Sequence, residues 1–154
     1  MAVKLSEINR FSVKFPSKST NESFARSMAA AFIAQLDPTL DELGDVKTAV
    51  SEAVTNAIVH GYRDSIGDIT MTVRLLEPDT VEITVADKGC GIADVPAARE
   101  PLFTTGGAER SGMGFTIMES FMDSLRVRSA PGKGTSITMR KRLNTRRYIS
   151  GGSR

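Results

Sequence analysis

The stretch VSEAVTNAIVHG at residues 50–61 decides the fold. Its apolar residues recur at helical spacing and continue a stripe that starts at Leu40 and runs to Ile58, so the sequence predicts one amphipathic helix. Pro38 is expected at the first helical position, where its missing N–H is no loss, and Gly61 is expected to end the helix.

A polar row follows this helix. Glu52, Asn56 and His60 are spaced four residues apart, so they lie on one side of it. Asparagine is a weak helix former whose amide needs hydrogen-bond partners. The row could be a solvated edge, but we take it as a candidate site because glycine-rich turns occur elsewhere in the chain. His60 alone is interpreted as a packed or capping histidine.

The remaining patterns predict alternating strands and helices. Ser19 and Glu22 have capping-box spacing, which marks the start of a helix. Strands are expected at 8–15, 69–76, 80–87, 125–129 and 135–143, helices at 20–36 and 115–122, and a short helix near 95–100. Helices segregated from antiparallel strands form a two-layer sandwich. We therefore predict an α+β fold, an α/β sandwich whose mostly antiparallel, mixed sheet is covered on one face by helices.

Two glycine turns carry chemistry. The run Asp87-Lys88-Gly89-Cys90-Gly91 follows a predicted strand, so a carboxylate is followed by glycines that let the backbone approach a flat ligand. Such a carboxylate can accept a hydrogen bond from an exocyclic amine. The run RSGMGF at 110–115 opens a helix with bare amides and a cation, which favours an anion. Each turn alone is common.

Several other site classes are excluded. The run at 132–135, GKGT, lacks the hydroxyl residue after lysine and the earlier glycine of a Walker A loop. The turn at 89–91 lacks the third glycine of a dinucleotide fingerprint. With one cysteine, Cys90, and one histidine, the chain offers neither a zinc set nor a plausible hydrolase triad.

The composition of the chain limits the number of domains, the class of partner and the cellular location that we expect. The chain has 154 residues, a size that suits one domain, and a formal charge of only +2. Basic residues concentrate at 140–154, so we expect no direct nucleic-acid binding and interpret 144–154 as a basic, flexible tail. A lone cysteine and the lack of a signal segment predict a cytoplasmic protein, and no apolar run reaches the length of a membrane helix.

These motifs, in this order, resemble a known superfamily. Glu52-x3-Asn56, Asp87-x-Gly89-x-Gly91, Gly112-x-Gly114 and the turn at 132–135 look like the N, G1, G2 and G3 boxes of the GHKL ATPases. This resemblance implies the Bergerat ATP-binding fold. The stretches 21–26, 51–62 and 99–119 resemble more narrowly the sporulation anti-sigma F factors, a family of serine-protein kinases. The resemblance makes 1–143 an ATP-binding kinase domain.

The resemblance also implies a role for each matching residue. Glu52 would orient or deprotonate the attacking hydroxyl. Asn56 would give an oxygen to Mg²⁺, Asp87 would hold the adenine amine, and Arg110 would face the γ-phosphate from a lid. The implied cofactors are ATP and Mg²⁺. The nucleotide-binding residues would be Asn56, Asp87, Gly89, Gly91, Thr104, Thr105, Arg110, Ser111, Gly112, Met113, Gly114, Phe115 and Thr135.

Partners follow from the same resemblance. Members of the family act as homodimers, bind sigma factor F, and phosphorylate a serine of an anti-anti-sigma protein. Arg26 matches an arginine used at the partner surface, although it could equally be an ordinary exposed charge. Three alternatives stay open: a general-stress anti-sigma B-type kinase, a histidine-kinase catalytic domain, and a non-catalytic module that binds ATP.

Overall fold

Five strands form one sheet in the order β1-β2-β3-β5-β4, and every neighbouring pair is antiparallel. The computed structural model describes residues 4–100 and 109–143. Its elements are β1 (Glu7–Pro16), α1 (Thr20–Ile33), η1 (Ala34–Leu36), α2 (Leu40–Asn56), η2 (Ala57–Gly61), β2 (Asp68–Leu76), β3 (Thr80–Asp87), α3 (Val95–Arg99), α4 (Glu109–Phe121), β4 (Ser124–Ser129) and β5 (Thr135–Arg142).

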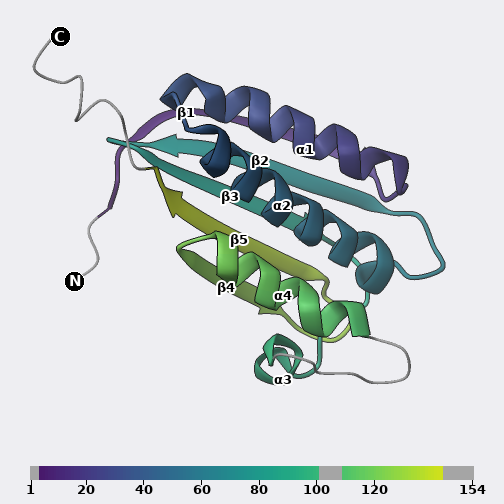
Figure 1. Cartoon of the computed structure of the whole chain (residues 1–154). Coiled ribbons are helices and arrows are strands. Elements are labelled where there is room, and N and C mark those ends of the chain that lie inside the picture. The colour runs from purple at the N-terminus through teal and green to yellow at the C-terminus, as the bar shows by residue number, and fades with distance from the viewer. Residues whose placement is uncertain (1–3, 101–108, 144–154) are drawn as a thin grey trace, which may run out of the picture.

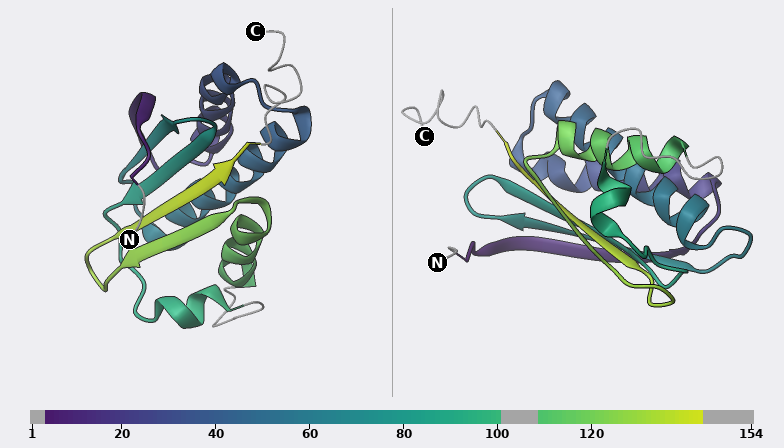
Figure 2. Two further views of the ribbon diagram at one scale, coloured as in Figure 1. Left: turned by 90° about the vertical axis from the view of Figure 1, so that its left-hand side faces the viewer. Right: turned by 90° about the horizontal axis from the view of Figure 1, so that it is seen from below.

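Helices α1, α2 and α4 cover one face of the sheet and leave the other face open (Figures 1 and 2). The core fills the space between these layers, where Val46, Val50 and Val54 of α2 are fully buried together with Met71 and Ile83 of the sheet. The predicted α+β two-layer sandwich is thus confirmed. The sheet is antiparallel throughout rather than mixed, because two successive helices between β1 and β2 return the chain in the opposite direction.

The start of α2 differs from the prediction. Asp37 adopts a left-handed conformation with φ of 55°, and Thr39 is extended. Thr39 is the N-cap: its hydroxyl accepts from the Glu42 N–H at 3.1 Å, and the Glu42 carboxylate accepts from the Thr39 N–H at 2.8 Å. The capping box therefore lies here. The prediction of a capping box at Ser19 is wrong, because Ser19 has a helical backbone conformation and its side chain makes no cap hydrogen bond.

We expect Thr39→Ala to lower the free energy of unfolding by about 1 kcal/mol, because the mutation removes the acceptor for an orphan helix N–H. Ser19→Ala is the matched control and should change the free energy of unfolding by less than about 0.5 kcal/mol. Urea unfolding followed by circular dichroism measures both. Equal effects of the two variants would contradict this assignment of the capping box.

The far end of the same helix is also informative. The chain passes from α2 into η2, a wider π-type turn, and the Tyr62 N–H closes it on the Ala57 carbonyl at 3.0 Å. Helical structure ends at Gly61, as predicted. π-Type turns occur frequently at functional sites because they redirect side chains along a helix. Leu40, which the predicted stripe placed in the core, is 87% exposed.

Helix α4 begins at Glu109, six residues before the predicted start at residue 115. The two glycines at 112 and 114 weaken the helical pattern in the sequence. Packing outweighs the low helix propensity of these glycines, because Gly114 is buried and Phe115, at 1% exposure, packs against the core. Within the described residues, no helix has the length and apolar character needed to span a membrane.

Candidate functional site

The row predicted on α2 reaches towards α4. Helix α2 lies between α1 and α4 (Figure 1). Glu52 is half-buried, and its Oε1 lies 3.5 Å from the position that a Cβ on Gly114 would occupy. Asn56, one turn later, is only 7% exposed. The structure thus brings the carboxylate of the first motif against the glycine-bearing turns of the third.

Asp87 ends β3 with a buried carboxylate. The residue is 8% exposed, and its Oδ1 accepts from the Gly89 N–H at 2.8 Å. Burial raises the pKa of this carboxyl group above its usual value, while hydrogen bonds from the backbone N–H groups of Gly89 and Thr135 oppose the shift. A buried carboxylate held by two amides is a well-fixed acceptor for a ligand N–H.

Glycine at 89 is required by a close approach of two chain segments. A Cβ on Gly89 would fall 2.0 Å from the Gly61 carbonyl oxygen, which is closer than a Cβ atom comes to a non-bonded heavy atom in folded proteins. The Cys90 N–H donates to the same carbonyl at 2.8 Å. The end of the predicted helix is therefore clamped to the turn after Asp87, and a Cβ on Gly61 would in turn lie 2.9 Å from the Asp87 carboxylate carbon.

The turn between β4 and β5 closes the site from the other side. Gly91 has a φ of +76°, and a Cβ there would lie 1.9 Å from the Ala130 carbonyl oxygen. The Gly132 N–H donates to the Cys90 carbonyl at 2.7 Å. Thr135 is 5% exposed and pairs directly with Asp87 in the sheet. The second and fourth predicted motifs therefore form one continuous structure around the buried carboxylate.

A hollow of about 300 Å³ opens beside this structure. Its lining includes Ala86, Ser136 and Arg128, which pair side by side across β3, β5 and β4, together with the turn residues Lys133 and Gly134. Ala86 and Ser136 alternate with Asp87 and Thr135 along their strands, so this hollow opens on the face of the sheet opposite to the Asp87 carboxylate.

Part of the predicted site falls outside what the structure describes. Thr104 and Thr105 lie outside the described residues, and for Arg110, Ser111, Gly112 and Met113 only the backbone of α4 is described. Gly114 and Phe115 are placed, both buried, in the first turns of α4. The predicted contacts to phosphate groups accordingly remain predictions.

Arg26 lies away from Asp87, on the side of α1 that faces α2. Its guanidinium Nη1 donates to Glu22 Oε2 at 2.8 Å and to Ser51 Oγ at 3.1 Å. With a side chain that is 35% exposed, Arg26 is more than a free surface charge. It reaches the helix that carries Glu52.

Two residues that the sequence analysis did not single out support the site. Tyr62 Oη accepts from the Lys88 N–H at 2.8 Å and donates to the Asp68 carbonyl at 2.6 Å. Ser129 Oγ accepts from the Ile92 N–H at 2.7 Å and donates to the Gly134 carbonyl at 2.9 Å. Tyr62 lies at the edge of the 51–62 resemblance, whereas no local signal marks Ser129, whose contact with Ile92 spans 37 residues.

The donor set around Glu52 and Asn56 suits a magnesium ion that is bound mainly through phosphates. Among residues 4–100 and the described part of 109–143, no cluster of three or more His, Cys, Asp or Glu side chains could hold a metal ion. Mg²⁺ typically takes one or two protein oxygens and completes its shell with water and substrate phosphates. The buried Asn56 amide, one turn from a carboxylate, fits that requirement.

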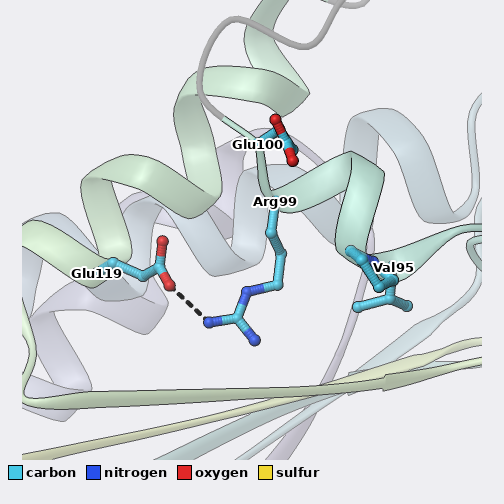
Figure 3. Close-up of a pocket in the computed structure, with 5 residues that line it drawn as sticks. Val95, Arg99, Glu100 and Glu119 are labelled. Atoms are coloured by element: carbon cyan, nitrogen blue, oxygen red, sulfur yellow. Dashed lines mark hydrogen bonds and ion pairs between the residues drawn. The ribbon is translucent and has the colours of Figure 1, made fainter.

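A second pocket lies between α3 and α4 (Figure 3). Its volume is about 510 Å³, and its lining includes Val95, Pro96 and Glu100. Arg99, the last residue of α3, donates to Glu119 of α4 at 2.6 Å across this pocket (Figure 3). The ion pair ties α3 to the helix that carries Gly114, although no residue of this pocket was predicted to bind a ligand.

Comparison with known proteins identifies the family of this chain. Residues 15–141 match the histidine kinase-like ATPase domain. An anti-sigma F factor of Caldanaerobacter subterraneus is 55% identical over 140 residues, which cover 90% of this chain and 97% of the relative. An anti-sigma F factor of Clostridium perfringens is 54% identical over 138 residues, which cover 89% of this chain and 99% of the relative.

Solved structures share the fold at lower identity. The RsbU and RsbW domains of a Mycobacterium tuberculosis protein align with a TM-score of 0.65 at 21% identity, covering 88% of this chain and 32% of that chain. A blue-light activated histidine kinase of Erythrobacter litoralis aligns with a TM-score of 0.57 at 19% identity, covering 79% of this chain and 42% of that chain. The ATPase domain implies ATP binding, and the chain belongs to the anti-sigma F factor family of histidine kinase-like ATPase domain proteins.

Proposed function

We propose that this protein binds and inhibits sporulation sigma factor F and that, as a Mg-ATP-dependent protein-serine kinase, it phosphorylates and inactivates an anti-anti-sigma partner. The observation that carries the proposal is the position of Glu52 against the first turns of α4, on the helical stretch whose end at Gly61 is clamped to the turn after the buried Asp87. The names of relatives at 53–55% identity support the sigma F branch. We expect the active unit to be a homodimer.

In the proposed reaction, Glu52 accepts a hydrogen bond from the serine hydroxyl of the partner and removes its proton as the new bond to phosphorus forms. Bound ATP would supply the γ-phosphoryl group and leave as ADP, while Mg²⁺ would neutralise charge on the phosphate oxygens. Gly114 leaves room beside the carboxylate, because nothing larger than a hydrogen projects towards Glu52 from this position. The helix start at α4 would stabilise the negative phosphates.

Nucleotide selection would depend on Asp87. Its buried carboxylate can accept a hydrogen bond from the exocyclic amine of adenine, a group that guanine lacks at the equivalent position. Asn56 would hold Mg²⁺ through its amide oxygen. Thr135, which pairs with Asp87, and the backbone of Gly89 and Gly91 would line the purine. Thr104, Thr105 and Arg110 would close over the phosphates.

The alternative as a histidine-kinase catalytic domain has less support. That chemistry needs a phosphorylatable histidine, and the sole histidine of the chain, His60, lies in η2 at the end of the predicted site. A non-catalytic module that uses ATP only to hold its conformation remains a second candidate. Only the catalytic proposal requires a carboxylate at residue 52.

Partner choice is tested by pull-down with purified sigma factors. We expect the protein to retain sigma F more strongly than sigma B when ATP is present, and Arg26→Glu to weaken retention at least tenfold, as expected at a charged interface hot spot. Arg63→Glu, on an exposed turn, is the matched control and should bind normally. Stronger retention of sigma B would move the protein to the general-stress branch, and normal binding by Arg26→Glu would remove Arg26 from the partner surface.

A further inference from the structure

A three-residue cluster joins α1 to α2 directly beside the proposed catalytic residue. Glu22 Oε2 accepts from the Ser51 hydroxyl at 2.6 Å and from Arg26 Nη1 at 2.8 Å. Arg26 Nη1 also donates to Ser51 Oγ at 3.1 Å. Each member thus contacts the other two, and all three side chains are partly buried.

Ser51 is the only member of the cluster on α2. Its hydroxyl both donates and accepts, so the serine is fixed by a carboxylate and a guanidinium from the neighbouring helix. Hydrogen bonds to charged groups are stronger than those between neutral groups. The next residue along α2 is Glu52, whose side chain faces the opposite neighbour, α4. Ser51 is therefore anchored to α1, while Glu52, the next residue, presents its carboxylate to the proposed site.

We propose that Ser51 is a positioning residue for Glu52, held in place by Glu22 and Arg26 of α1. This inference rests on the proposed kinase function. Rotation or sliding of α2 by a fraction of a helical turn moves the Glu52 carboxylate away from the attacking hydroxyl, and a misplacement of about 1 Å can cost roughly a hundredfold in rate. The two hydrogen bonds of Ser51 oppose such movement.

The test compares Ser51→Ala, Ser51→Thr and Ser23→Ala in the full chain. Ser51→Ala removes the hydroxyl from α2, while Ser51→Thr keeps it. Ser23 is the matched control, since its hydroxyl contacts Arg26 Nη2 at 3.3 Å but lies on α1 and does not hold α2. The assays are phosphoryl transfer to an anti-anti-sigma protein and binding of a non-hydrolysable ATP analogue.

We expect kcat to fall about tenfold in Ser51→Ala, while the Kd of the ATP analogue stays within about twofold of the wild-type value. In Ser51→Thr, kcat should recover. In Ser23→Ala, kcat should equal that of the wild type. A normal kcat in Ser51→Ala overturns the inference while leaving the kinase intact. Equal losses in Ser51→Ala and Ser51→Thr, or a loss explained by weaker nucleotide binding, also overturn it. Absence of transfer by wild type overturns the proposed function and this inference together.

Discussion

Glu52→Gln is expected to slow phosphoryl transfer by about 10²–10⁴-fold while leaving ATP bound. Glutamine has the same shape as glutamate but no basic carboxylate, so the attacking hydroxyl keeps its proton. General-base catalysis contributes about 10²–10⁴-fold to rate, and the loss should lie in this range. Glu52 is half-buried beside Gly114, and a side chain of equal size preserves that packing. The measurement is single-turnover transfer of γ-labelled phosphate, together with calorimetric ATP binding.

Glu77→Gln is the matched control, because Glu77 is an exposed turn residue far from the site in the sheet register. It should transfer phosphate at the wild-type rate. Normal transfer by Glu52→Gln would show that Glu52 is not the base. Loss of ATP binding in that variant would instead assign Glu52 to the metal or the nucleotide.

Asp87→Asn is expected to weaken ATP binding by about 2 kcal/mol, or roughly thirtyfold in Kd. The single amide oxygen of asparagine is needed for the Gly89 N–H that Asp87 Oδ1 now accepts, so the amide nitrogen is left to face the adenine amine. The side-chain NH₂ of the asparagine and the adenine amine are then both hydrogen-bond donors, so they repel each other. Isothermal titration calorimetry measures the change, and Asp64→Asn on an exposed turn is the control.

The same substitution should not destabilise the nucleotide-free protein. Because burial raises the pKa of Asp87, the folded state binds the proton more tightly than the unfolded state. The stability from Asp87 is thus fully present below its unfolded pKa and is lost as pH rises through the folded pKa. At about pH 7, Asp87→Asn should equal or exceed wild type in free energy of unfolding, and the difference should shrink towards about pH 4. A large loss of stability in Asp87→Asn at neutral pH would contradict the idea that the protein keeps a buried carboxylate at residue 87 for function and at the expense of stability.

The sequence predicted the site best where spacing along one element determines geometry. Glu52 and Asn56 are one turn apart on any helix, and Asp87 ends a strand whose alternation is unambiguous. The structure places Glu52 and Asn56 on α2 and Asp87 at the end of β3, the element positions that the sequence predicted; their functional roles stay predictions. The turn at 89–91 could also be found from its glycines, and the structure explains why glycine is needed there, because a Cβ on Gly89 would overlap the Gly61 carbonyl oxygen.

Features that depend on tertiary contacts were predicted less well. Ser19 and Thr39 have the same capping-box spacing, and only the backbone conformation at each N-cap decides which box forms. The contact of Arg26 with Ser51 could not be predicted from the sequence, because it joins residues 25 positions apart. Helix α4 starts early since packing of Phe115 outweighs the weak local pattern.

The most direct test of the central claim is to mix the purified protein with Mg²⁺, γ-labelled ATP and an anti-anti-sigma protein, and to identify the labelled residue by mass spectrometry. The account predicts that label reaches a serine of the partner, and that omission of Mg²⁺ or the change Glu52→Gln prevents it. Label found only as free phosphate, on His60 of this chain, or nowhere would contradict the assignment as a protein-serine kinase.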